Sequence, residues 1–207
     1  MLELQSISKT FHPGTIHAKK ALQNLSLSLN DGDFVTVIGG NGAGKSTLLN
    51  AIAGVWPVDE GSILIDGVDV TGLPEYKRAA FIGRVFQDPM LGTAPNMQIE
   101  ENLALALRRG KKRTLRWGVT KQEREDYYER LHALGLGLEK RMTDKVGLLS
   151  GGQRQALTLL MASLQKPKLL LLDEHTAALD PATAAKVLEL SDVLFVIYVL
   201  SQILQIL

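Results

Sequence analysis

A glycine-rich run has the residue types and the spacing needed to hold a chain of phosphates. Residues 39–47 read Gly-Gly-Asn-Gly-Ala-Gly-Lys-Ser-Thr, which matches the pattern G-x-x-x-x-G-K-[ST]. Glycines let the backbone curl so that its N–H groups point inward at an anion, and a flexible structural turn is the alternative. Lys45 can reach the terminal phosphates, and the Ser46 hydroxyl can bind Mg²⁺. The run therefore predicts a site for ATP and Mg²⁺ made by Gly39, Gly40, Asn41, Gly42, Ala43, Gly44, Lys45, Ser46 and Thr47.

A pair of acidic residues supplies a second candidate site. Leu169–Leu172 is a short apolar run, typical of a parallel strand buried on both faces, and Asp173 and Glu174 follow it. Residues at the carboxyl end of such a strand face the crevice where open α/β sheets bind ligands. We expect Asp173 to hold Mg²⁺ through water and Glu174 to be the general base for the attacking water. Taken alone, the pair could be a strand that ends at the solvent.

A third candidate is the run Leu-Ser-Gly-Gly-Gln at residues 149–153, which precedes the helical spacing of Gln153–Leu164. Ser150, Gly151, Gly152 and Gln153 then stand at a helix N-terminus, where free N–H groups suit an anion. The alternative is that Ser150 is an ordinary N-cap, and the two roles are compatible.

Strands and helices are expected around these runs. Alternating leucines in Leu25–Leu29 predict a half-buried strand, and the β-branched run Phe34–Ile38 predicts a buried strand that leads into the glycines. Asp180 is expected to be the N-cap of a helix that begins at Pro181. Further strands are expected at 62–65 and 82–86, and further helices at 46–53, 100–109 and 121–134.

A basic run lies between two of these helices, at Arg108–Arg113, with Arg116 close behind. Such a run could contact phosphates or lipid headgroups. A solvated loop is the favoured interpretation, because blocks of like charge usually lie in water.

Composition limits the classes of protein. A chain of 207 residues can form one sizeable domain, and a net charge of +1 gives no indication of a nucleic-acid partner. The absence of cysteine excludes disulfides and thiolate metal sites and suits a reducing cytosol. The N-terminus has no signal-peptide pattern. The uncharged stretch Val193–Leu207 would span about 22 Å as a helix, short of the roughly 30 Å of a bilayer core.

The order of the three runs resembles that of ABC-type ATPases, from about Leu2 to about Leu190. The resemblance implies an α/β fold of the P-loop NTPase class, with a mixed or parallel sheet core, an N-terminal antiparallel β subdomain and a helical insertion subdomain. It implies one domain over residues 1–207, in which 1–87 and 151–190 form the core with the β subdomain. Residues 88–150 would form the helical subdomain, and 191–207 an atypical apolar tail.

The resemblance also implies roles for single residues. Gln87 would reach Mg²⁺ or the attacking water, and the ring of Phe11 would stack on adenine, although a phenylalanine at a strand end is more often part of a core. Asp180 would lie near the seam of a dimer. Two copies would pair head to tail, with each ATP between the phosphate loop of one copy and Ser150–Gln153 of the other.

The sequence departs from the family pattern near its C-terminal end. No histidine follows His175, and the strand that ends in Thr-His in relatives is expected to be missing, together with the last part of the domain. That histidine contacts the terminal phosphate in the family, so impaired hydrolysis by this chain is expected. A shortened or frame-shifted gene product after residue 190 is one hypothesis, which the genomic DNA in all three frames would test.

The favoured function is an ATP-hydrolysing subunit, cytoplasmic and peripheral on the inner face of the membrane. It would drive solute transport through a separate membrane permease, with bacterial small-solute uptake and a secreted substrate-binding protein favoured over export. One alternative is a nucleotide-binding module with little turnover. Another is a soluble ABC protein that acts on DNA or ribosomes, which only the basic run favours, so no nucleic-acid partner is expected.

Overall fold

The computed structural model describes residues 1–88, 90–111, 118–173 and 195–200. It divides into two compact units. The first holds the described residues of Met1–Arg84, Lys168–Glu174 and Leu194–Leu207, and the second those of Val85–Pro167 and His175–Val193. Glu174, His175, Asp180 and the helix expected at Pro181 lie outside the described residues, as do Lys112, Arg113 and Arg116 of the basic run.

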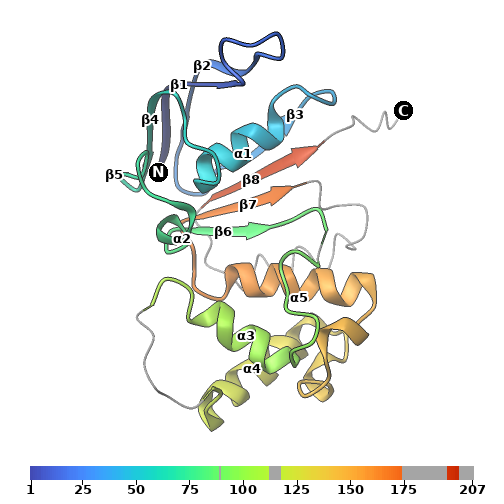
Figure 1. Ribbon diagram of the computed structural model, residues 1–207. Helices are drawn as coiled ribbons and strands as arrows, with labels where there is room; N and C mark the ends of the chain where they lie inside the picture. Colours follow the sequence, from blue (N-terminus) through green and yellow to red (C-terminus); the bar gives the residue numbers. More distant parts are fainter. Residues whose placement is uncertain (89, 112–117, 174–194, 201–207) are drawn as a thin grey trace, which may run out of the picture. The chain divides into compact units, whose positions relative to one another are not determined.

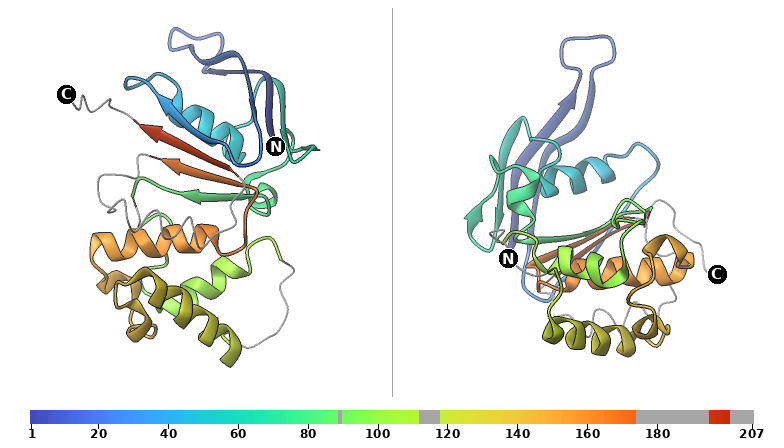
Figure 2. Two further views of the ribbon diagram at one scale, coloured as in Figure 1. Left: turned by 180° about the vertical axis from the view of Figure 1, so that it is seen from behind. Right: turned by 60° about the horizontal axis from the view of Figure 1, so that its bottom comes forward.

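An antiparallel sheet forms the N-terminal part of the first unit, as expected. Its strand order is β2-β1-β4-β5. The bounds are Leu2–Phe11 for β1, Lys19–Leu29 for β2, Glu60–Ile65 for β4 and Val68–Asp69 for β5. The β1–β2 hairpin extends past the other strands of this sheet (Figure 2), and its register places Phe11 opposite Lys19.

The second sheet has the order β3-β8-β7-β6. Its strands are Phe34–Ile38 (β3), Ile82–Val85 (β6), Leu169–Asp173 (β7) and Phe195–Leu200 (β8). β8 lies between β3 and β7 and runs parallel to both (Figure 1). The expectation that no strand is present here is therefore wrong, although Ser201 and Gln202 follow β8 where the family pattern has Thr-His. Phe-Val-Ile-Tyr-Val-Leu is a continuous apolar run, the kind of sequence that suits the interior of a parallel sheet.

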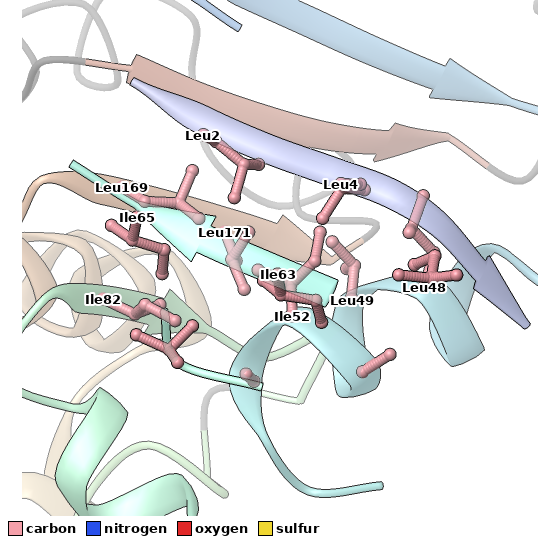
Figure 3. Close-up of a cluster of buried hydrophobic side chains, with 14 of the residues drawn as sticks. Leu2, Leu4, Leu48, Leu49, Ile52, Ile63, Ile65, Ile82, Leu169 and Leu171 are labelled. Atoms are coloured by element: carbon pink, nitrogen blue, oxygen red, sulfur yellow. The ribbon is translucent and has the colours of Figure 1, made fainter. Parts of the chain in front are cut away.

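An apolar core joins elements of the first unit (Figure 3). Helix α1, Lys45–Ala53, contributes Leu49 and Ile52, both fully buried, to this core. Leucines of β1 and β7 and isoleucines of β4 and β6 surround them. Burying such a side chain stabilises the fold by about 1.5–3 kcal/mol. The helix that begins at the phosphate loop is thus fixed in place along its apolar side.

The strand β3 was expected to be buried, and the structure corrects this. Val35 and Val37 pack against the core, but Phe34 is 60 % exposed and Ile38 is 54 % exposed. β3 is at the edge of its sheet, and the other described elements leave its Phe34–Ile38 face open. The β-branched pattern predicted the strand and could not predict which of its faces is covered.

The second unit is helical. It contains α3 (Ile99–Leu107), α4 (Lys121–Leu134) and α5 (Gly151–Ser163), with short 3₁₀ turns at Leu138–Lys140 and Val146–Leu148. A further helix, α2 (Glu75–Arg78), belongs to the first unit. α3 packs against α5, so residues 151–167 lie with the helical unit and not with the core, which differs from the boundary expected at residue 150.

The basic run is only partly a solvated loop. Arg108 Nη2 donates to both carboxylate oxygens of Glu123, at 2.9 and 3.1 Å. Arg109 Nη2 donates to the Ala162 carbonyl at 3.1 Å, and burial lowers the pKa of Arg109. The solvated-loop interpretation is therefore wrong for these two arginines, because each has an internal acceptor. Among the described helices, none is both long enough and apolar enough to cross a bilayer.

Candidate nucleotide-binding site

The phosphate loop lines a cavity of about 210 Å³ in the first unit. The β1–β2 hairpin supplies Phe11, Lys19 and Ala21 to its wall. The remaining wall is made of Asn41, Gly42, Ala43, Gly44, Lys45, Ser46 and Thr47. The structure thus brings Phe11 together with the glycine-rich run, as the resemblance implied.

A close approach between the loop and β2 requires glycine at position 44. Gly44 has a φ of +90°, and a Cβ built there would lie 2.5 Å from the Ala21 carbonyl oxygen. From Gly44 the chain enters α1, where Leu48 N donates to the Gly44 carbonyl at 2.8 Å. The first N–H groups of a helix have no partner within the helix. These free N–H groups and the positive end of the helix dipole suit an anion.

The ammonium group of Lys45 is hydrogen-bonded to the backbone of the phosphate loop. Only 8 % of the residue is exposed, and Nζ donates to the carbonyls of Gly39 at 2.6 Å and Gly40 at 2.9 Å. Gly39 and Gly40 therefore contact the site through Lys45 rather than by lining the cavity. A phosphate oxygen is a stronger acceptor for an ammonium group than a neutral carbonyl, so these bonds can be exchanged for bonds to a ligand.

Two side chains, Trp56 and Lys9, contact the ring of Phe11 at the end of β1. The Trp56 ring packs edge to face against it, with centroids 5.0 Å apart. Lys9 Nζ lies 5.9 Å from the ring centroid and pairs with Asp59 at 2.8 Å. Asp59 also accepts from Thr10 N at 2.6 Å, and the hydrogen bond from Lys9 is the main cause of the lowered pKa of this carboxyl. Trp56 and Asp59 were not expected from the sequence, which gives no periodic signal for either.

Asp173 stands at the carboxyl end of β7, partly buried, as expected for a residue that faces a ligand crevice. Arg84 on β6 is a neighbour that the sequence did not indicate. Burial lowers the pKa of Arg84, while the Asp173 carboxylate acts in the opposite direction. Arg84 Nη2 also donates to Asn50 Oδ1 of α1 at 2.7 Å. These contacts tie the acidic strand end to the helix that begins at the phosphate loop.

Gln87 and the run Ser150–Gln153 belong to the second unit. Gln87 is exposed. Ser150 Oγ accepts from Gln153 N at 3.3 Å, and Ser150 N donates to Gln153 Oε1 at 3.2 Å. This reciprocal pair is a capping box at the start of α5. The N-cap interpretation of Ser150 is therefore confirmed, while a role toward nucleotide stays a prediction.

The residues present fit a magnesium ion bound together with a triphosphate. The structure has no cluster of three acidic or histidine side chains for a metal among its described residues. Mg²⁺ bound with a nucleotide needs few protein ligands, because phosphate oxygens and water complete its octahedron. Ser46 lines the cavity and is exposed, and Asp173 is the last residue of β7 and carries a carboxylate that could supply a second oxygen ligand.

Two characterised groups of proteins are similar in sequence. The tyrosine transport ATP-binding protein of Clostridioides difficile (strain R20291) is 47 % identical over 192 residues, which cover 93 % of this chain and 76 % of that protein. The spermidine/putrescine import ATP-binding protein PotA of Haemophilus influenzae is 40 % identical over 182 residues. The chain spans 44 % of the length of that relative.

Solved structures agree with the sequence matches. A dimeric ATP-binding cassette in a post-hydrolysis state, bound to ADP and Pi, superposes with a TM-score of 0.80 at 30 % identity. The match covers 98 % of this chain and 88 % of that one. A nucleotide-free cassette matches with a TM-score of 0.74 and 29 % identity over 96 % of this chain and 80 % of that one. The family model described as ABC transporter matches residues 22–177. With the phosphate loop, the acidic strand end and the capped glycine run in their expected elements, the chain belongs to the ABC transporter family, as an ATP-binding subunit of the ATPase type.

Proposed function

We propose that this chain binds Mg²⁺ and ATP in the cavity at the start of α1 and hydrolyses the nucleotide to drive solute uptake through a separate permease. The observation that carries the proposal is that Phe11 and Lys45 line one cavity. An aromatic face suits a purine, and a buried ammonium group with exchangeable partners suits terminal phosphates. A purine nucleoside triphosphate carries both of these groups, the base and the terminal phosphates.

Each candidate residue then has a defined task. Lys45 and the loop amides bind the phosphates, and Ser46 and Asp173 hold the metal, which neutralises phosphate charge when bound. Glu174 accepts a proton from the attacking water, and Gln87 orients that water. Ser150–Gln153 contact the nucleotide held by a second copy of the chain in a head-to-tail dimer. The dimeric state of a matched cassette supports this arrangement.

The names of the relatives suggest the solute class. One is named for tyrosine transport and another for spermidine/putrescine import. We propose uptake of an amino acid or polyamine, with the chain at the cytoplasmic face, bound to permease subunits and served by a secreted substrate-binding protein. Uptake of labelled tyrosine and spermidine by vesicles that contain the chain and its permease tests this proposal. If the vesicles take up neither solute, the proposed solute class is contradicted.

Calorimetry and phosphate release test the nucleotide chemistry. Mg·ATP should bind the unaltered chain, and Lys45→Ala should lose most of the affinity. Lys77→Ala, which changes an exposed lysine of α2, is the matched control and should bind normally. Glu174→Gln should keep binding and lose phosphate release. Normal affinity in Lys45→Ala would refute the site.

A second candidate is a binding module without turnover. The sequence has no histidine after His175, and β8 ends at Leu200 in place of Thr-His. If the unaltered chain releases phosphate no faster than Glu174→Gln while both bind Mg·ATP, this second function is the correct one.

A further inference from the structure

We propose that Lys19 is a second cation for the phosphate chain of the bound nucleotide, an inference that rests on the proposed ATP site. Lys19 lies on β2, outside the glycine-rich run. Its side chain lines the same cavity as Lys45. A Cβ built on Gly42 would lie 3.4 Å from Lys19 Nζ, so the ammonium group lies next to the loop backbone.

The register of the hairpin explains why this lysine faces the loop. Phe11 on β1 is opposite Lys19 on β2, so the two side chains project to the same face of the pair. Ala21, two residues further along β2, lines the same cavity, and its carbonyl makes the close approach to Gly44. A nucleotide whose base lies on Phe11 and whose terminal phosphate reaches Lys45 must therefore pass Lys19.

The charge of Lys19 is available to a ligand. Within the described part of the chain, its ammonium group has no carboxylate partner and no hydrogen bond. Two other lysines of this unit are paired, Lys9 with Asp59 at 2.8 Å and Lys168 with Asp66 at 2.9 Å. Lys45 Nζ is held by two carbonyls. A triphosphate carries more negative charge than one ammonium group balances, so a second cation next to the loop adds attraction at the phosphates.

Lys20 is the matched control. It follows Lys19 on β2, is also exposed, and pairs with Thr10 in the register, which places it on the opposite face. A change of charge at either position alters the net charge of the protein equally. A difference between the two variants therefore reports position and not long-range electrostatics.

Titration calorimetry with two probes, Mg·ATP and Mg·tripolyphosphate, tests the assignment on the full chain. Lys19→Gln should weaken both probes by about five- to tenfold, the scale of one charge-assisted hydrogen bond. Lys20→Gln should change neither by more than about twofold. Lys19→Arg should restore most of the affinity for both. Circular dichroism and thermal unfolding confirm that the variants are folded.

The remaining outcomes are distinct. If Lys19→Gln weakens Mg·ATP but not Mg·tripolyphosphate, the lysine contacts the base or ribose and the phosphate role is refuted. If Lys19→Gln and Lys20→Gln behave alike while Lys45→Ala loses binding, the inference fails and the proposed ATP site stands. If Lys45→Ala also binds normally, the proposed site itself is wrong.

Discussion

Arg78 Nη1 donates a hydrogen bond to the Ala51 carbonyl oxygen at 2.8 Å, in the last turn of the helix that begins at the phosphate loop. The same nitrogen donates to Ile52 O, and the rest of the guanidinium donates to Leu73 O and Thr71 O. Arg78 is 2 % exposed, and burial lowers its pKa. Its partners are all backbone carbonyls, so this arginine acts as a C-terminal cap for α1. A positive charge at that end of a helix is favourable.

Replacing Arg78 should therefore destabilise the fold without touching the ligand. Arg78→Met removes four hydrogen bonds to carbonyls, two of them buried and two partly buried, and the free energy of unfolding should fall by more than about 3 kcal/mol. The loss of stability in Arg78→Lys should be intermediate. The ammonium group of a lysine is too compact to reach all the carbonyls that surround the planar guanidinium group of Arg78. Urea unfolding measures this, with Lys77→Ala as the exposed neighbour for comparison. A loss below about 1 kcal/mol in Arg78→Met would contradict the capping role.

Gly44 and Gly40 give a matched pair within the phosphate loop. Gly44→Ala must place a Cβ against the Ala21 carbonyl at a positive φ, so stability should fall by more than about 2 kcal/mol and Mg·ATP binding should be lost. A Cβ at Gly40 would have no atom within 4 Å, so Gly40→Ala should unfold at the same denaturant concentration as the unaltered chain. Equal unfolding midpoints for the two variants would show that the approach of β2 is not rigid.

Trp56 should affect nucleotide binding through Phe11. Phe11→Ala should weaken Mg·ATP by about five- to tenfold and leave Mg·tripolyphosphate unchanged, because only the base stacks on the ring. Trp56→Ala should act in the same direction by about two- to fivefold, since the edge-to-face contact that fixes the ring is lost. Ile16→Ala, at a hairpin residue that is 96 % exposed, is the control. Weaker tripolyphosphate binding in Trp56→Ala would show that the phosphate loop has moved as well.

Tyr127 should set the stability of the protein at high pH. Its buried hydroxyl has no hydrogen bond of normal geometry among the described residues, and burial raises its pKa from 10.0 to about 12, against a smaller opposite effect of Arg108. The unfolded chain loses this proton first, so the folded state should lose stability as the pH rises from 10 to about 12.

The variant Tyr127→Phe removes that proton and the unpaired hydroxyl together. It should match or exceed the unaltered chain in stability at neutral pH and should resist the alkaline loss. Tyr128→Phe is the control, because Tyr128 is 45 % exposed. Thermal unfolding across this pH range measures both. Parallel curves for Tyr127→Phe and the unaltered chain would contradict the burial effect.

The local pattern of the sequence predicted much of the secondary structure. The spacing in Lys121–Leu134 predicted α4 with the bounds that the structure gives it, because a strong N-cap at Thr120 and a glycine at Gly135 mark both ends. The phosphate loop was recognisable because a curled backbone demands glycine at fixed positions. Lys19 and Trp56 were not, since their place at the cavity depends on the hairpin register and on a packing contact far along the chain.

The strand β8 shows where local pattern fails. Its uncharged sequence fitted a core strand, a helix or an unrelated tail equally well. Pairing on both sides, with β3 and with β7, selects the strand. The exposure of Phe34 likewise depends on which elements cover a sheet face, which the sequence of β3 does not contain.

The insertion of β8 between β3 and β7 also orders events during synthesis. Phe34 pairs with Val196, so the strand that leads into the phosphate loop waits for a segment that is made much later in the chain. Contacts between residues this distant in sequence form slowly. The long segment between them loses conformational entropy before the strand pairing compensates for that loss. Until β8 has left the ribosome, the nascent chain therefore exposes the unpaired edges of β3 and β7 to solvent and to chaperones, and the sheet beneath the nucleotide pocket is complete only afterwards.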